Sequence, residues 1–121
     1  MLAQVDSSVG GKVAIDNEFG KNLVGAFYQP KLVIADTEVL KTLDERQFKT
    51  GLAEVVKYGF IEKNCGFTTD FNFLEFLKNN KDKIFAQDVT TMQKLISICC
   101  NLKASVVFQD EKEKNLRQIL N

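Results

Sequence analysis

The sequence predicts an α+β fold that is mostly α, with a strand-rich first part and a helical remainder. Two observations predict this division. Short apolar stretches separated by the glycine pair Gly10 and Gly11 fill much of the first forty residues, a pattern typical of strands joined by loops. After Thr42, capping residues stand before longer amphipathic runs with helical spacing. We therefore place the boundary between the two parts at residues 37–43.

Three short strands are expected in the first part, at residues 1–6, 12–16 and 31–36. The last of these, KLVIAD, is a compact apolar run rich in β-branched residues, which is typical of a strand buried on both faces. The only proline, Pro30, stands directly before it, where a strand boundary tolerates proline.

The second part begins with two predicted helices. Asp44 is followed three residues later by Gln47, and this spacing predicts a capping box that opens a helix running through residue 63. Thr69 is expected to cap a second helix over residues 71–80, whose phenylalanines and leucines mark a buried face.

A third helix is expected from Asp88 to Phe108, and its two faces differ in polarity at about 100° per residue. Lys103 falls among the apolar residues, so its side chain either reaches out to solvent or meets an anion in a partly buried site, and the sequence leaves both open. The polar face holds Gln93, Lys94, Ser97, Asn101 and Ser105, and the apolar face holds Met92, Leu95, Ile96, Cys99, Val106 and Val107.

Asp110 and Glu113 predict another capping box, which would open a last helix over residues 113–121. Glu113, Arg117 and Asn121 would share one face of this helix, and Arg117 is suited to holding a carboxylate or phosphate at two points. The alternative is a solvated helix face on which Glu113 serves only as a cap, and the residues alone favour that alternative.

The composition of the 121 residues excludes several classes of function. Sixteen basic and sixteen acidic residues cancel, so no net charge recruits nucleic acid or an anionic membrane. No apolar run approaches the roughly 20 residues that span a bilayer. Three cysteines and an N-terminus without a secretory pattern predict an intracellular, reduced protein. Cys99 and Cys100 are interpreted as buried apolar residues, because nothing nearby completes a metal site. The chain has no histidine.

The glycine–lysine pairs of the first part do not form a known phosphate loop. Asp6 occupies the position of the first glycine of a Walker A motif, and Val13 replaces the Ser or Thr that would hold magnesium. The glycine fingerprint of dinucleotide-binding proteins is also absent. Lys12 and Lys21 can hold phosphate or carboxylate as point charges. The alternative of loop-tip charges is favoured when each lysine is considered alone.

Glu54 and Lys57, within GLAEVVKYG, lie three residues apart and share one face of the first helix. Spacing alone favours a surface ion pair worth a few tenths of a kcal/mol. The competing interpretation is that Glu54 and Lys57 are half of a site whose remaining residues lie elsewhere in the chain.

The order of six motifs is more specific than any one motif. LAQVDSSVGGK, GKNLVGAFYQPK, DTEVLKTL, GLAEVVKYG, LKASVV and DEKEKNLRQILN follow one another with spacings that resemble 3-dehydroquinate synthase. The resemblance implies that residues 1–40 are the C-terminal part of an NAD-binding α/β domain. Residues 41–121 would be the first part of a helical domain that binds substrate and metal. The chain would thus be an internal α+β fragment of a longer protein, and inactive by itself.

The family converts 3-deoxy-D-arabino-heptulosonate 7-phosphate to 3-dehydroquinate and phosphate in the shikimate pathway, by transient oxidation with NAD, phosphate elimination and an aldol cyclisation. The resemblance implies NAD and Zn²⁺, or another divalent metal such as Co²⁺, as cofactors. It also implies a cytoplasmic homodimer with no nucleic-acid or membrane partner. In the family a Gly-His-rich stretch that supplies metal ligands follows the LN at the end of this chain, which explains the missing histidines.

Matching the family motifs assigns roles to individual residues. Glu54 would be a metal ligand, Glu113 the proton acceptor, and Lys57 and Lys103 catalytic residues that also bind substrate. The remaining substrate contacts would come from Asp6, Lys12, Asn22, Glu54, Arg117 and Asn121. Contacts with NAD would come from Lys21, Val39, Leu40, Lys41 and Thr42.

The chain departs from the usual family residues at Val13, Asp16, Asp44 and Asn115, none of which is assigned chemistry. At Asn115, where glycine is usual, asparagine tolerates a left-handed backbone. Two other functions stay open: a related sugar-phosphate cyclase with a different substrate, and a non-catalytic helical module that serves in assembly. An alcohol dehydrogenase of the same broad superfamily is disfavoured, because it would not need so many substrate-facing lysines.

Overall fold

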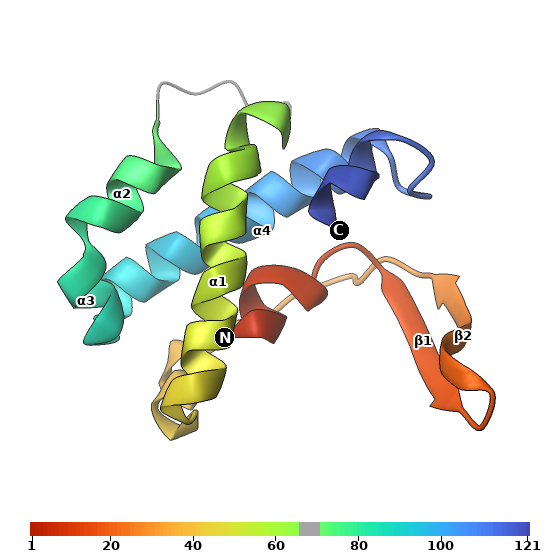
Figure 1. Ribbon diagram of the computed structural model, residues 1–121, viewed down its shortest axis with the longest axis horizontal. Helices are drawn as coiled ribbons and strands as arrows, with labels where there is room; N and C mark the ends of the chain where they lie inside the picture. Colours follow the sequence, from red (N-terminus) through yellow and green to blue (C-terminus); the bar gives the residue numbers. More distant parts are fainter. Residues whose placement is uncertain (66–70) are drawn as a thin grey trace.

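The computed structural model describes residues 1–65 and 71–121, which form a mostly helical body and one small sheet (Figure 1). The two longest helices, α1 (Glu45–Ile61) and α4 (Val89–Gln109), cross each other and carry much of the core. The two shorter α-helices are α2 (Phe73–Asn79) and α3 (Lys81–Phe85). Single helical turns complete the body: η1 (Ala3–Ser7), η2 (Thr37–Thr42), η3 (Glu62–Cys65) and η4 (Leu116–Leu120).

The core lies between α1 and α4 and is closed by the shorter elements. Tyr58, Phe73 and Met92, from three different helices, are fully buried in it. η1 packs against both α1 and α4, and η4 packs against α4. The N-terminal turn and the C-terminal turn are thereby brought to the same pair of helices (Figure 1).

The sheet is a two-stranded antiparallel hairpin of β1 (Lys12–Asn17) and β2 (Gly20–Phe27), in which Lys12 pairs with Phe27. It projects from the helical body in Figure 1, and nearly all of its residues are exposed. The strand expected at residues 12–16 is confirmed. Its partner β2 was not predicted separately, although Gly20, with a φ of 149°, marks the turn.

The strand expected at residues 1–6 is wrong, because the segment forms the helical turn η1 instead. Met1 and Val5, four residues apart, are both buried, and the Val5 amide donates to the Met1 carbonyl oxygen at 3.2 Å. A Cβ atom at Gly51 of α1 would lie 2.3 Å from the Met1 side chain, so the turn packs closely on this helix. A strand would place Met1 and Val5 too far apart along the chain for both to pack in this way.

The buried strand expected at residues 31–36 is also wrong. The segment has no strand assignment and no partner strand among the described residues, and Leu32 and Ile34 are 75% and 82% exposed. A strand requires partners for its backbone N–H and C=O groups. An apolar run can therefore have the composition of a buried strand without forming one in this chain.

The predicted starts of the two long helices are confirmed. Asp44 accepts a hydrogen bond from the backbone N–H of Gln47 at 2.9 Å, and Asp88 caps α4 by accepting from the N–H and hydroxyl of Thr91. Between them, the helix expected over residues 71–80 is the shorter α2, capped by Asn72, and is followed by α3. The proposed cap Thr69 lies outside the described residues.

The last helix does not begin at residue 113 as the capping-box pattern predicts. The Asp110 carboxylate accepts hydrogen bonds from the N–H groups of Lys114, Asn115 and Arg117, and only the short turn η4 follows. Glu113 has a φ of 55° and does not act as a capping residue, whereas Asn115 has a φ of −146°. The left-handed residue is thus Glu113, and the role expected for Asn115 is wrong.

Among the residues that the structure describes, no helix is long and apolar enough to cross a membrane.

The contact between α1 and α2 generates a stability prediction at Gly59. Alanine normally stabilises a helix interior by about 0.5–1 kcal/mol relative to glycine. A Cβ atom at Gly59 would lie only 2.5 Å from Leu74 Cδ2, and overpacking costs about 1–3 kcal/mol. We therefore expect Gly59→Ala to lower the free energy of unfolding of this chain by about 1 kcal/mol in urea titrations.

A matched background tests the cause. In a Leu74→Ala variant the clash is gone, so adding Gly59→Ala should raise the free energy of unfolding by the usual helical increment. Equal destabilisation in both backgrounds would show that Leu74 is not responsible.

Candidate active site

Most of the charged residues singled out in the sequence meet where η1, α1, α4 and η4 come together. Lys103 of α4 is only 8% exposed, and its ammonium donates to the Asp6 carbonyl oxygen at 2.6 Å. The same Lys103 Nζ lies 3.0 Å from Asp6 Oδ1. Of the two alternatives that the sequence left open, the structure shows the second: Lys103 points inward and meets an anion.

Tyr58 of α1 completes this arrangement, which we call the Asp6 cluster (Asp6, Tyr58 and Lys103). The Tyr58 hydroxyl donates to Asp6 Oδ1 at 2.6 Å. Burial by itself would raise the pKa of Asp6. The hydrogen bonds from Tyr58 and Lys103, with the nearby positive charges, outweigh burial and hold that pKa below its usual value. Burial and the bond to Asp6 raise the pKa of Tyr58 far above its usual value, so its hydroxyl remains a donor.

Glu54 and Lys57 are a partly buried pair with tertiary contacts. Lys57 Nζ contacts Glu54 Oε1, and it also donates to the carbonyl oxygen of Leu120 in η4 at 2.6 Å. The same ammonium lies 5.4 Å from the centre of the Tyr58 ring. Lys57 therefore connects α1 to η4, which a solvated surface pair would not do.

Glu113 is held by residues from both ends of the chain. It forms an ion pair with Lys12 of β1, and its Oε1 accepts from the Asn121 side-chain amide at 2.6 Å. These two hydrogen bonds lower the pKa of Glu113, so the carboxylate is charged at neutral pH. Its left-handed backbone is one of the uncommon conformations that occur often at functional sites.

Arg117 faces inward and is 1% exposed. Its two terminal nitrogens donate to the carbonyl oxygens of Gly10 and Glu111, each at 2.6 Å. The expected shared helix face of Glu113, Arg117 and Asn121 does not form, because η4 is too short. Asn121 nevertheless reaches Glu113 through its side chain. A Cβ atom at Gly10 would lie 2.4 Å from Arg117, so this approach requires glycine.

The inner side of the hairpin borders a cavity of about 660 Å³. Lys12, Asn22 and Glu113, three of the predicted site residues, line it. Asn22 has a φ of 57°, and its backbone N–H donates to Asp16 Oδ1 at 3.0 Å. The remaining lining residues are Val13, Ala14, Leu23, Gly25, Ala26 and Phe27.

The residues expected to contact NAD lie on two separate elements. Lys21 is exposed on β2, and Val39, Leu40, Lys41 and Thr42 are the last four residues of η2. The hairpin and η2 lie apart in Figure 1. The Leu40 side chain is buried in the core, so only its backbone is available to a ligand.

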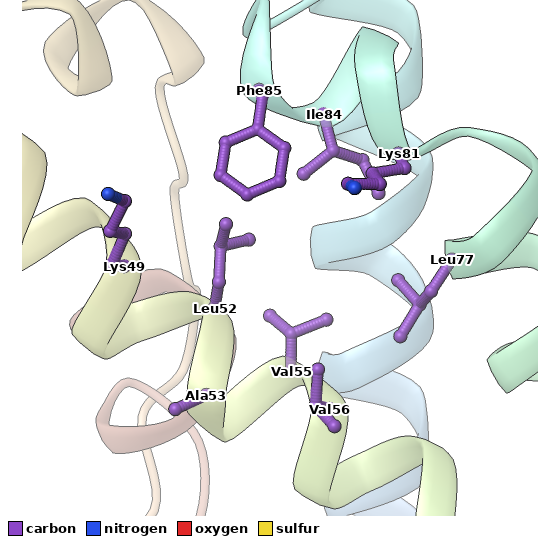
Figure 2. A pocket seen from close by; sticks show the side chains of 9 residues that line it. All are labelled: Lys49, Leu52, Ala53, Val55, Val56, Leu77, Lys81, Ile84 and Phe85. Atoms are coloured by element: carbon purple, nitrogen blue, oxygen red, sulfur yellow. The ribbon is translucent and has the colours of Figure 1, made fainter.

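A second, apolar pocket lies away from the charged residues, between α1 and the α2–α3 segment (Figure 2). Leu52, Val55 and Leu77 are among its lining residues, together with Lys49 and Lys81. Within the part of the chain that the structure describes, its lining includes none of the predicted site residues.

The candidate metal ligand Glu54 has a buried Oε1 that lies against Lys57 Nζ without a well-formed hydrogen bond. A metal ion at this oxygen would have to displace or share the Lys57 ammonium. Within residues 1–65 and 71–121, however, no group of three His, Cys, Asp or Glu side chains comes together. Glu54 therefore fits as one ligand of a set that the described residues do not complete.

Sequence reasoning missed two contributors, Tyr58 and Gly10. Tyr58 follows Lys57 directly and belongs to the buried side of α1, where a hydroxyl requires a hydrogen-bond partner. That requirement was readable from the sequence. The close approach of Arg117 to Gly10 spans 107 residues and was not.

Comparison with known proteins gives the family. The family model described as "3-dehydroquinate synthase N-terminal" matches residues 1–50. The model described as "3-dehydroquinate synthase C-terminal" matches residues 51–121. The junction of the two matches falls within α1, whereas the domain boundary expected after residue 40 falls in η2 and stays a prediction.

Curated relatives carry the same name. The chain is 53% identical over 121 residues to the 3-dehydroquinate synthases of Pelobacter propionicus and Aliivibrio fischeri, and 50% identical to that of Desulforamulus reducens. Each match covers 100% of this chain and 32% of the relative, so the chain spans about a third of their length. The resemblance seen in the six motifs is confirmed, and the chain belongs to the 3-dehydroquinate synthase family.

Proposed function

We propose that this chain supplies part of the active site of a 3-dehydroquinate synthase, a lyase of the shikimate pathway. The reaction converts 3-deoxy-D-arabino-heptulosonate 7-phosphate to 3-dehydroquinate and phosphate, on the route to chorismate and the aromatic amino acids. One observation carries the proposal: in a chain of this family, distant segments form two neighbouring sets of contacts, which Lys57 links by donating to Leu120 beside Asn121. The first set comprises Asp6–Lys103 and Glu54–Lys57, and the second comprises Lys12, Glu113 and Asn121. The proposal includes a cytoplasmic homodimer.

Substrate binding is assigned to the cationic side chains. The substrate carries a phosphate and a carboxylate, and both are anions at neutral pH. Lys57, Lys103 and Arg117 each donate to backbone carbonyl oxygens. Such donors can turn to a charged oxygen of the substrate, because a bond to an anion is stronger than a bond to a neutral carbonyl. Lys12 and Asn22 would hold the part of the substrate that enters the cavity beside Glu113.

Proton transfer is assigned to Glu113. Its lowered pKa keeps it ionised, and its contacts with Lys12 and Asn121 fix the carboxylate at the edge of the cavity. A carboxylate in this position can accept a proton from a bound sugar phosphate if the donor atom comes within hydrogen-bond distance. The ion pair with Lys12 would also help to orient the carboxylate.

Two cofactors complete the proposal. NAD would reversibly oxidise a substrate hydroxyl, and Zn²⁺, or Co²⁺ in its place, would act as a Lewis acid. Glu54 would hold the metal together with ligands from outside the described residues. Lys21, Val39, Lys41 and Thr42 would contact NAD, with Leu40 contributing its backbone.

The proposal is tested with a chimera in which these 121 residues replace the matching third of the Pelobacter propionicus 3-dehydroquinate synthase. We expect the chimera to convert 3-deoxy-D-arabino-heptulosonate 7-phosphate to 3-dehydroquinate, measured by phosphate release and product analysis. The 121-residue chain alone should be inactive. A folded chimera that turns over only another sugar phosphate would indicate a related cyclase. A folded chimera without activity would contradict the proposal.

Glu113→Gln should lower kcat of the chimera by about 100-fold or more, because positioned acid–base groups contribute about 10²–10⁴-fold. The glutamine side chain keeps the shape of glutamate, and its amide oxygen can still accept a hydrogen bond from Lys12. It cannot take up the proton that the reaction removes from the substrate. Glu75→Gln, an exposed residue of α2, is the matched control and should leave kcat unchanged. A Glu113→Gln chimera with nearly normal kcat would remove Glu113 from its assigned role.

Glu54→Gln should weaken Zn²⁺ binding to the chimera by more than about 100-fold, since supporting groups alone change metal affinity by about 10–100-fold. Zinc content after dialysis and titration against a zinc-sensitive dye report this directly, without an activity assay. Glu45→Gln, at the exposed start of the same helix, should retain the metal. Unchanged zinc content in the Glu54→Gln chimera would rule out Glu54 as a ligand.

A further inference from the structure

We propose that Tyr58 is a positioning residue, whose hydroxyl fixes the Asp6 carboxylate and thereby aims the Lys103 ammonium into the active site. The inference rests on the proposed function for the identity of the substrate. It goes beyond that function by assigning a role to a residue for which the family resemblance gave none.

The geometry of the Asp6 cluster carries the inference. Asp6 Oδ1 is contacted by the Tyr58 hydroxyl at 2.6 Å and by Lys103 Nζ at 3.0 Å, so one oxygen has two donors. The shorter of the two contacts comes from Tyr58. Lys103 Nζ makes its closest contact, at 2.6 Å, with the Asp6 backbone oxygen instead. A carboxylate held by Tyr58 therefore leaves Lys103 less tightly bound to it.

Burial makes this arrangement rigid. Tyr58 is fully buried, which limits the rotation of its ring, and Lys103 is nearly so. The three residues belong to η1, α1 and α4, which pack against one another, so the backbones that carry them are held in place. The hydroxyl of the fully buried Tyr58 contacts Asp6, which is why we assign it a positioning rather than a catalytic role.

Removing the hydroxyl has a defined consequence. In a Tyr58→Phe variant, Asp6 Oδ1 loses a donor and turns fully to Lys103, and the tighter ion pair withdraws the ammonium from the substrate. The ring remains to fill the core. We therefore expect a higher KM for the sugar phosphate and a kcat/KM lower by about 10- to 100-fold, the range for losing a hydrogen bond to a charged group.

The chain offers a matched control and a background that isolates the cause. Tyr28→Phe changes the only other tyrosine, which is exposed, and should leave kcat/KM of the chimera unchanged. If Tyr58 acts through Asp6, then Tyr58→Phe should cost less than about 2-fold in an Asp6→Asn background. An equal loss in both backgrounds, or no loss in the single variant, would overturn the inference.

A second measurement needs no catalysis and uses the 121-residue chain. The ¹³C signal of the Asp6 carboxyl group is followed by NMR during acid titration. Tyr58→Phe should raise its midpoint by a measurable amount below about 1 pH unit, because the lost donor raises it and the tighter pair with Lys103 offsets part of that rise. An unchanged midpoint would overturn the inference. The other titratable groups that face Asp6 from α1 and α4 are Lys57, Cys99, Cys100 and Lys103.

The two measurements separate the possible failures. A wild-type chimera without 3-dehydroquinate synthase activity would contradict the proposed function alone, and the titration of Asp6 would still decide whether Tyr58 fixes this carboxylate. An active chimera with normal Tyr58→Phe kinetics would contradict the role of Tyr58 alone.

Discussion

A lysine on the apolar face of a helix is the constraint on which the rest of this structure depends. Lys103 lies among buried side chains of α4, where an unpaired ammonium would cost several kcal/mol. Its partner Asp6 is 97 residues away in the sequence. The N-terminal segment must therefore turn back onto α4, and η1 packs there with Val5 buried while Met1 packs on α1. The Asp6–Lys103 ion pair and the apolar packing of η1 both require the N-terminal segment to lie against α4.

The segment that follows Asp6 accepts a second buried cation from the C-terminal turn. Arg117 donates to the Gly10 carbonyl oxygen, and the space for the guanidinium exists only because Gly10 has no side chain. Two residues later, Lys12 pairs with Glu113. One stretch of seven residues, 6–12, thus contacts α4 and the segment before and within η4. This explains why the positive φ angles of Gly10 and Gly11 occur here.

The sequence was a good guide where a local rule and the tertiary structure agree. Asp44 caps the helix that it was expected to cap, and Asp88 stands at the expected start of α4, because capping depends on residues three positions apart. Helical periodicity placed Lys103 on the apolar face of α4 but left open whether its side chain reaches solvent or meets an anion. The strand expected at residues 31–36 was wrong, because a strand needs a partner strand and the composition of a segment does not show whether one is present. The helix expected from Glu113 was wrong, because the Asp110 carboxylate accepts from the backbone N–H groups of Lys114, Asn115 and Arg117 and holds this segment in a loop.

The sequence proposed the candidate site as a set of residues, which stays a prediction, but not as a geometry. The family motifs identified Asp6, Lys57 and Lys103, yet nothing in the sequence placed Tyr58 between them. Arg117 was expected to face a ligand, whereas its guanidinium is engaged by the Gly10 and Glu111 carbonyl oxygens. Contacts that span half the chain or more depend on how the helices pack, and no local pattern encodes them.

The balance of charge in the site gives these contacts a common meaning. Lys12, Lys57 and Lys103 each pair with one carboxylate, that of Glu113, Glu54 and Asp6 respectively. The guanidinium of Arg117 instead donates to carbonyl oxygens, and the Asp110 carboxylate accepts from its backbone N–H. Three of the cations also donate to backbone carbonyl oxygens, which orient them without cancelling their charge. The cations of the site are therefore held in a fixed arrangement, from which they could turn to the phosphate and carboxylate of the sugar phosphate that we propose as substrate.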